Sequence, residues 1–496
     1  MEEKAKSIPR HEAANYRITD ADDLGSGGPK AKYADNVRAI RLLKELASEQ
    51  RQATLEEQKI LVRYVGWGGL SQAFDSKNEK WSKEYEELKE LLSETEYRAA
   101  RRSTQNAHYT SFQVIQFMHQ ILERLGFRQG RALEPSVGVG HFIGMLPPAL
   151  QKTTVFGVEL DEITGAIAQQ LYPKANIQAG KGFQEVNVPA GYFDLVFGNP
   201  PFGNEKVFDP AHPDLSKFSI HNYFFAKSIE ALRPGGLLTM VVSNSLMDKQ
   251  GQAERQWMSE RTRFIGAIRL PNNAFKQNAG TEVTTDILIL QKLSPEEQSS
   301  PSLNRGPSWL DLKRVTDPKT GQPIPTNEYF ATHPEMMLGT MTLSGSMYRA
   351  GTPALVQDDS MDLQAQLERV LQELPEGLYT QGKSLEESTL DASVQVPKEV
   401  KVGGYFVDPQ GQIRMRKPDQ LGSATSAITG HTGTVAERIK SMVKVRDALK
   451  NVLRAELQDA PQRQLQMLRD ALNKLYDQHV QKHGLLHEEG NRRAMK

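Results

Sequence analysis

The stretch LEPSVGVGHF, residues 133–142, decides the fold. An apolar run that ends in the carboxylate of Glu134 is typical of a strand, and Gly138 and Gly140 follow where a Cβ atom would keep a ligand from the backbone. Ile143 occupies the place of the third glycine of the dinucleotide fingerprint, which disfavours a pyrophosphate ligand. The stretch predicts a nucleotide-type turn between a strand and a helix, with an ordinary glycine turn as the alternative.

A second carboxylate favours a ligand at this turn. Glu159 ends the apolar run 154–159 and lies 21 residues (159 − 138) after Gly138. This spacing is close to the roughly 20 residues after which an acid binds the hydroxyls of a ribose. The alternative for Glu159 is a carboxylate that caps a helix.

Short β-branched apolar runs alternate with helical stretches after Arg101. The runs cover residues 131–133, 154–159, 193–197, 237–243, 264–269 and 286–291. This alternation predicts an α/β fold in which helices cover both faces of a parallel sheet. Apolar periodicity predicts further helices at residues 34–47, 55–64, 83–92, 434–457 and 462–480.

Length and composition limit the classes of function that the chain can have. At about 150 residues per domain, 496 residues allow roughly three domains. The lack of cysteine excludes disulfides, thiolate chemistry and cysteine-ligated metal sites, and most of the eleven histidines are scattered along the chain, so we expect no metal site. No secretory signal opens the chain and no window approaches 18 apolar residues, so we expect a cytoplasmic protein without a membrane partner.

Charge is balanced over the chain but segregated at its end. The 61 basic and 61 acidic residues cancel. Residues 351–397 carry −7 (two basic, nine acidic), and residues 398–496 carry +7 (18 basic, 11 acidic). The basic end is equally consistent with phosphate contacts and with a solvated surface. Any nucleic-acid partner would be held by such a local patch.

The stretch FDLVFGNPPF, residues 193–202, carries the reaction chemistry. Two prolines fix the backbone after Asn199, so Asn199 and the Pro200 carbonyl would form a rigid pair of acceptors. The amino group of adenine is a poor nucleophile because its lone pair is delocalised into the ring. Two acceptors would localise that lone pair and aim it at an electrophilic methyl group. Phe202 would stack on a base that has left the duplex.

In order and spacing, these motifs resemble the γ-class S-adenosylmethionine-dependent DNA N6-adenine methyltransferases. The resemblance rests on the loop 133–142, on Glu159 and on the box 199–202, and it extends upstream to residues 108–111. It covers about residues 105–292. It implies a Rossmann-like class I methyltransferase sheet with a helical N-terminal extension and a mostly helical C-terminal region.

The resemblance also implies an enzyme that transfers a methyl group from S-adenosylmethionine to N6 of a flipped-out adenine in DNA. The catalytic residues would be Asn199, Pro200, Pro201 and Phe202. The cofactor would contact Tyr109, Thr110, Glu134, Pro135, Gly138, Gly140, Glu159, Leu160 and Phe183.

Flanking segments resemble the methylase part of methylase–helicase proteins of phages, plasmids and conjugative elements. They are residues 33–36, 65–69 and 327–339, and residues 280–290 are similar to the late strand of type I modification subunits. No phosphate-binding loop of a helicase occurs in the sequence. The implied setting is restriction-modification or a mobile element in a bacterial or phage-infected cell, with a separate helicase or specificity subunit left open. Trp67, among glycines, is expected to fill a packing corner.

The sequence departs from the family pattern at two places. Gly182 precedes Phe183 where the family usually has an Asp that accepts the amino group of the cofactor adenine, and Gln184 is a candidate replacement. Residues 287–290 are aliphatic where many members have an aromatic that stacks on the flipped base, and Phe275 is a candidate for that role.

We therefore predict four segments. They are a helical extension (1–100), a methyltransferase core (101–295), a linker with an acidic accessory region (296–397) and a basic helical region (398–496). Two other functions stay open: a non-catalytic DNA-binding subunit of a defence or anti-defence system, and a protein glutamine methyltransferase, which also presents an Asn-Pro-Pro loop to a planar amide.

Overall fold

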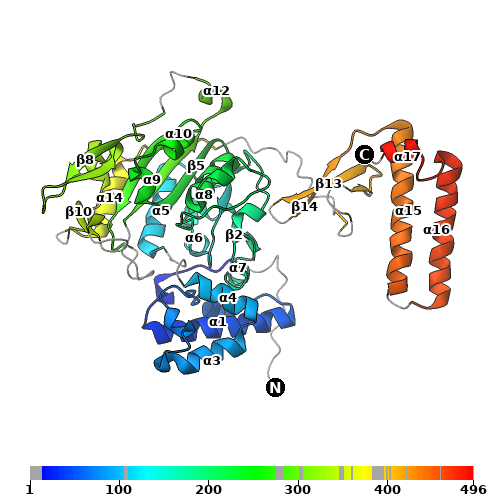
Figure 1. Ribbon diagram of the computed structural model, residues 1–496, viewed down its shortest axis with the longest axis horizontal. Coiled ribbons are helices and arrows are strands. Elements are labelled where there is room, and N and C mark those ends of the chain that lie inside the picture. Colours follow the sequence, from blue (N-terminus) through cyan, green and yellow to red (C-terminus); the bar gives the residue numbers. More distant parts are fainter. Residues whose placement is uncertain are drawn as a thin grey trace. The chain divides into compact units, whose positions relative to one another are not determined.

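The computed structural model divides the chain into two compact units, residues 1–382 and 383–496 (Figure 1). The residues that it describes are 14–104, 110–274, 284–300, 305–345, 351–358, 361–381, 396–397, 400, 404–420, 423–457 and 460–494.

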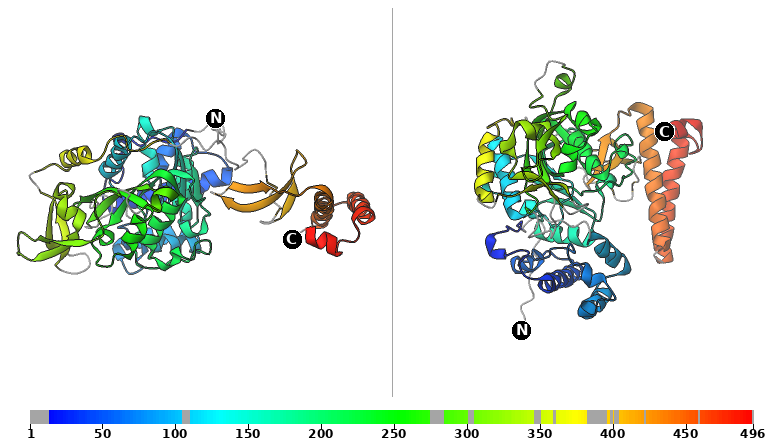
Figure 2. Two further views of the ribbon diagram at one scale, coloured as in Figure 1. Left: turned by 90° about the horizontal axis from the view of Figure 1, so that it is seen from above. Right: turned by 60° about the vertical axis from the view of Figure 1, so that its left-hand side comes forward.

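A seven-stranded sheet forms the centre of the first unit, in the order β3-β2-β1-β4-β5-β7-β6 (Figure 2). The strands are β1 (Arg131–Glu134), β2 (Thr154–Glu159), β3 (Asn176–Ala179), β4 (Phe193–Gly198), β5 (Leu232–Ser243), β6 (Thr262–Leu270) and β7 (Thr285–Lys292). This order confirms the Rossmann-like class I methyltransferase sheet. The sequence analysis missed β3, a short strand in which polar Asn176 and Gln178 alternate with apolar residues.

The sheet is mixed, whereas the alternation of strands and helices predicted a parallel one. The first five strands pair in parallel, but β7 runs antiparallel to both β5 and β6. Strands β6 and β7 follow each other in the chain and pair directly, which favours the antiparallel sense. The four residues 287–290 are fully buried. Since successive side chains of a strand point to opposite faces, both faces of the sheet are covered.

Helices that precede or follow individual strands cover the sheet. They are α5 (Phe112–Arg124), α6 (His141–Gly144), α7 (Glu162–Leu171), α8 (Ile220–Ala231), α9 (Asn244–Asp248) and α10 (Ala253–Ser259).

Among the described residues, four more helices lie N-terminal to α5, and α1 and α2 pack against α7. They are α1 (Pro29–Glu49), α2 (Leu55–Leu61), α3 (Ser82–Leu91) and α4 (Glu94–Ser103). Trp67 is buried against the rings of Tyr33, Tyr64 and Phe74, so it fills the packing corner that the sequence predicted. Gln58 on α2 donates to the Leu171 carbonyl at the end of α7, which fixes the helices to the core.

The described parts of residues 305–381 form helices and strands in the region that the sequence analysis assigned to a linker and an acidic accessory region. Two hairpins, β8–β9 and β10–β11, pack with α13 and α14 against the core, and the Trp309 ring stacks on Phe264 at 4.8 Å. Scattered apolar residues of this region cover the β6 side of the sheet. Because they follow no local periodicity, the sequence pattern did not reveal this packing. The bounds are β8 (Leu312–Thr316), β9 (Pro323–Asn327), α13 (Glu328–Thr332), β10 (Thr340–Gly345), β11 (Thr352–Val356) and α14 (Leu363–Glu373).

The second unit combines a small sheet with a helical hairpin. Helices α15 (Gly433–Leu457) and α16 (Gln462–His483) pack along each other, close to the predicted bounds. The three-stranded antiparallel sheet was not expected from the sequence. Its strands are β12 (Tyr405–Val407), β13 (Ile413–Gln420) and β14 (Ser423–Ile428), and α17 (Glu489–Ala494) completes the unit. Tyr405, Ile413, Ile439, Met442, Val443 and Ala494 form its core.

None of the helices in the described residues has the length and apolar character that crossing a membrane requires. Among the same residues, no group of three or more His, Asp or Glu side chains is arranged to hold a metal ion.

A buried ion pair tests the packing of β6 and β7. Arg269 donates to both carboxylate oxygens of Asp286, at 2.7 and 2.9 Å, and both side chains are fully buried. We expect Arg269→Leu to lower the free energy of unfolding by about 3 kcal/mol, because it leaves a buried carboxylate without its partner. Urea denaturation measures this change. Arg98→Leu removes the exposed pair with Glu94 and should cost less than about 1 kcal/mol; equal losses would contradict the prediction.

Candidate active site

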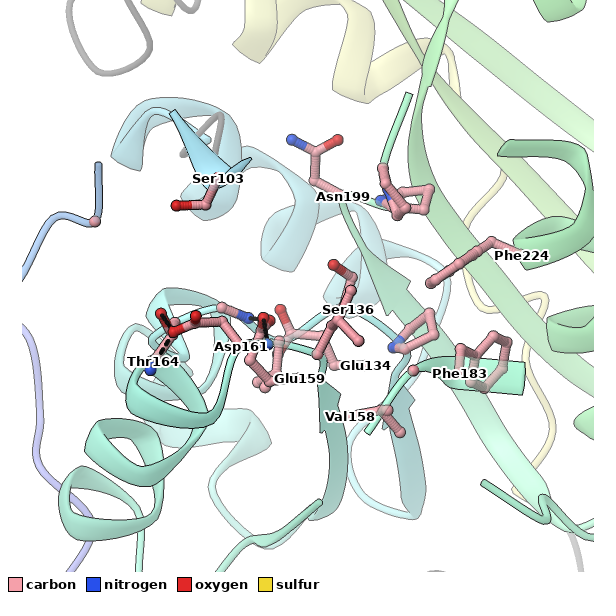
Figure 3. A pocket seen from close by; sticks show the side chains of 18 of the residues that line it. Ser103, Glu134, Ser136, Val158, Glu159, Asp161, Thr164, Phe183, Asn199 and Phe224 are labelled. Carbon is pink, nitrogen blue, oxygen red and sulfur yellow. Dashed lines mark hydrogen bonds between the residues drawn. The ribbon is translucent and has the colours of Figure 1, made fainter. Parts of the chain in front are cut away.

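A cavity of about 570 Å³ opens where β1, β2 and β4 end (Figure 3). Carboxyl ends of neighbouring parallel strands are where open α/β sheets bind ligands. Gly140 lies outside the lining, and Tyr109 lies outside the described residues. The other predicted site residues all line the cavity: Thr110, Glu134, Pro135, Gly138, Glu159, Leu160, Phe183, Asn199, Pro200, Pro201 and Phe202.

The two glycines of the loop after β1 serve different contacts. Gly138 has a φ of 55° and faces the cavity, where its N–H donates to Glu159 Oε2 at 2.9 Å. Gly140 has a φ of 82°, and a Cβ atom there would overlap the ring of Tyr172. Gly138 therefore shapes the cavity, whereas Gly140 allows the loop to pack against Tyr172.

The Glu159 carboxylate is held by backbone donors at the end of β2. Besides Gly138, the N–H of Asp161 donates to its Oε1 at 2.9 Å. Asp161 caps α7 by accepting from the N–H of Thr164, so the cap that was the alternative for Glu159 belongs to Asp161. Burial raises the pKa of Glu159 to about 7 despite these donors.

Glu134 places a second carboxylate in the cavity. The side chain is 1 % exposed, and within the described part of the chain its Oε2 has no hydrogen-bond partner. Burial, with a smaller contribution from the charge of Glu159, raises the pKa of Glu134 well above its usual value. Two desolvated acids in one cavity favour a ligand that carries positive charge.

A hydrogen bond from Asn199 to Thr110 orients the amide at the end of β4. Asn199 Nδ2 donates to the Thr110 hydroxyl at 3.1 Å. With Nδ2 on Thr110, Oδ1 is the other end of the amide. Oδ1 is buried and has no partner among the residues described, so the structure holds a free acceptor at the cavity, as Figure 3 shows for Asn199.

His221 contacts the proline corner, which is formed by residues 199–202. The sequence analysis missed this histidine. Its Nδ1 lies 3.2 Å from the Pro201 carbonyl oxygen, and its ring meets Phe202 edge to face at 5.1 Å. Burial lowers the pKa of His221 to about 4, so the ring is neutral at physiological pH. Because the carbonyl can only accept, Nδ1 carries the proton and donates. No motif marks this histidine; only its packing does.

A buried lysine connects the corner to Phe183. Lys227 on α8 is 2 % exposed and donates to the Phe183 carbonyl at 2.7 Å, to the Val186 carbonyl at 3.0 Å and to Asp209 at 3.0 Å. Asp209 also accepts from the hydroxyl of Tyr223 at 2.6 Å. The loop after the prolines is thus fixed to the wall that contains Phe183.

The N-terminal helices supply another wall of the cavity. Their lining residues are Tyr64, Gly66, Ala99, Arg102 and Ser103. Asn36 fixes the glycine run, since its Nδ2 donates to the Gly66 carbonyl at 2.6 Å and its Oδ1 accepts from the N–H of Val65 at 2.9 Å. The sequence analysis singled out the run 65–69 only for its resemblance to methylase–helicase proteins and for the packing of Trp67, and did not place it at the cavity.

Two sequence comparisons relate the chain to methyltransferases. Residues 150–275 match the family described as Eco57I restriction-modification methylase. Defense against restriction protein B of Escherichia phage P1 is 28% identical over 273 residues, which are 54% of this chain and 10% of that protein. The chain thus spans about a tenth of that relative. The rRNA N(6)-adenosine-methyltransferase metl-5 of Caenorhabditis elegans is 22% identical over 189 residues, 36% of this chain and 84% of that protein.

Two solved structures resemble the chain at low similarity. A class I S-adenosylmethionine-dependent methyltransferase from Listeria monocytogenes has 15% identity and a TM-score of 0.35, with 54% of this chain and 89% of that chain covered. The M protein of the type I restriction enzyme EcoKI has 14% identity and a TM-score of 0.34, with 92% of each chain covered.

The sheet order is that of the class I methyltransferase fold, whose cofactor is S-adenosylmethionine, and the cavity lies at the carboxyl ends of its parallel strands. Within this fold, residues 150–275 are the part that matches the Eco57I restriction-modification methylase family. The cavity fits this cofactor, because the unpartnered oxygen of Glu134 and the raised pKa values of Glu134 and Glu159 favour a cation, and S-adenosylmethionine carries a sulfonium and an ammonium group.

The raised pKa of Glu159 predicts that cofactor binding depends on pH. The ionised carboxylate is the form that attracts a cation and accepts hydrogen bonds from hydroxyl groups. Cofactor binding therefore releases a proton from Glu159. We expect S-adenosylmethionine to bind about tenfold more tightly at pH 8 than at pH 6, with affinity levelling off above the pKa. Calorimetry measures this, and Glu159→Gln should flatten the profile. A wild-type dissociation constant that is equal at both pH values would contradict the prediction.

Proposed function

We propose that the protein is a DNA adenine methyltransferase that transfers a methyl group from S-adenosylmethionine to N6 of an adenine flipped out of the duplex. The observation that carries this proposal is the free acceptor of Asn199, which is fixed by Thr110 beside a rigid pair of prolines. The Eco57I family match and the similarity to an N6-adenosine methyltransferase support an adenine amino group as the target.

In this mechanism, Asn199 Oδ1 and the Pro200 carbonyl each accept one hydrogen of the amino group. When bound, the cofactor supplies an electrophilic methyl group on a positively charged sulfur. The amino nitrogen uses its lone pair to form the new bond to carbon, while the electrons of the carbon–sulfur bond go to sulfur. The two acceptors stabilise the positive charge that develops on nitrogen, and a proton then leaves to solvent. Phe202 stacks on the extruded base, and His221 keeps the corner rigid.

The cofactor is proposed to lie along the loop after β1. Glu134 faces the cationic end of the cofactor. The walls around the cofactor are formed by Pro135, Gly138 and Leu160. Glu159 accepts hydrogen bonds from the ribose hydroxyls. Thr110, Phe183, Gly140 and Tyr109 complete the set of cofactor residues proposed from the sequence.

DNA is the proposed partner, and a bacterial or phage-infected cytoplasm is the proposed location. The restriction-modification family and the phage relative support this setting. A separate helicase or specificity subunit is a further proposed partner. The basic hairpin α15–α16 is proposed to contact phosphates.

Asn199→Ala tests the mechanism. We expect it to reduce methyl transfer to DNA at least about a hundredfold, because one of two charge-stabilising acceptors is lost. Binding of S-adenosylhomocysteine, measured by calorimetry, should stay within about threefold, since no contact to the cofactor is removed. Asn204→Ala is the matched control, because Asn204 is exposed on the same loop and lies outside the cavity lining.

The same assay separates the other candidate functions. Tritium from labelled cofactor should enter DNA, and sequencing of DNA from a methylation-deficient host should locate N6-methyladenine. Label in protein would favour a glutamine methyltransferase, and label in RNA would favour the reaction named for the metl-5 relative. Failure to bind the cofactor would favour a non-catalytic DNA-binding subunit.

Thr110→Val tests the orientation of the amide. We expect a fall of about tenfold in the rate of methyl transfer, because the Asn199 amide loses the hydrogen bond that selects its rotamer. Thr110→Ser keeps the hydroxyl and should retain most of the activity. If both variants transfer methyl groups at the wild-type rate, Thr110 does not orient Asn199.

A further inference from the structure

The sheet order places the base of the cofactor near the turn after β3. Glu159 ends β2, and β3 is the next strand outward. Since an acid at the end of the second strand accepts ribose hydroxyls, the base that the ribose carries lies beyond it, over residues 180–184. Phe183, Phe224 and Val158 line the cavity there and provide an apolar slot for a planar ring (Figure 3).

Three backbone groups of Gly182 and Phe183 in this turn are already engaged. The N–H of Gly182 donates to Glu185 Oε2 at 2.6 Å, and the carbonyl of Gly182 accepts from the N–H of Glu185 at 2.9 Å. The carbonyl of Phe183 accepts from Lys227. A side chain beside these engaged groups can supply polar recognition of a base in the slot.

The carboxamide of Gln184 lies where it can make polar contacts with the base. A Cβ atom built on Gly182 would lie 2.7 Å from Gln184 Cδ, so the Gln184 side chain fills the space that any side chain at position 182 would enter. Gln184 is half-buried and lines the cavity. No hydrogen bond to another described residue engages its carboxamide, and both polar atoms are available to a ligand.

We propose that Gln184 recognises the base of the cofactor through a pair of hydrogen bonds and thereby sets an unusual specificity. This inference rests on the cofactor placement of the proposed function. A carboxamide donates and accepts, so it pairs with the amino group and a ring nitrogen of adenine. When the carboxamide is rotated by half a turn, so that its nitrogen and oxygen exchange places, it pairs equally with the carbonyl and the ring N–H of hypoxanthine. A carboxylate accepts only and would reject the 6-oxo base. The site therefore binds 6-amino and 6-oxo purines alike.

Calorimetry with S-adenosylhomocysteine and S-inosylhomocysteine at pH 8 tests the proposal. We expect the wild-type protein to bind both within about threefold of each other. Gln184→Glu should keep the adenosyl ligand but weaken the inosyl ligand about tenfold or more, because the carboxylate faces a carbonyl oxygen and has no proton to donate. Gln184→Ala should weaken both ligands about equally, by roughly threefold to tenfold.

The controls separate this inference from the proposed function. Gln151→Ala removes an exposed glutamine outside the cavity and should bind both ligands as the wild type does. If Gln184→Ala binds both ligands at wild-type affinity, or if Gln184→Glu shows the same preference as the wild type, the inference is overturned while the proposed function stands. If the wild type binds neither ligand, both fall.

Discussion

The parallel pairing of β1, β2 and β4 is the constraint on which the site depends. Their carboxyl ends meet at one edge of the sheet, so three motifs that are far apart in sequence face one cavity. The glycine loop follows β1, Glu159 ends β2 and Asn199 follows β4. A change of register in any of these strands would move its polar group away from the others, because adjacent positions point to opposite faces.

Electrostatics then divides the cavity into two regions. Around the glycine loop, burial raises the pKa of Glu134 and of Glu159, so that end favours positive charge. At the proline corner, His221 is neutral and Asn199 presents an uncharged oxygen. A neutral acceptor suits an amine that becomes positive only during the reaction, because it stabilises the transition state more than the ground state.

The rigidity of the proline corner comes from residues outside the sequence motifs 133–142 and 193–202. His221 holds the Pro201 carbonyl, and Lys227 joins Asp209 to Phe183. The N-terminal helices add Tyr64 and the glycine run to the wall. Such contacts fix both sides of the cavity before any ligand arrives, which lowers the cost of reorganisation during a reaction.

The sequence by itself determined the strands β1, β2 and β4, the glycine turn and the proline corner, because these depend on local backbone preferences and on residue type. Only the tertiary structure decided the antiparallel sense of β7, the packing of residues 305–381 and the recruitment of His221 and Lys227. It also showed Gln184 in the space beside Gly182. These features arise from contacts between distant segments, and a linear pattern does not record which side chains meet after the chain has folded.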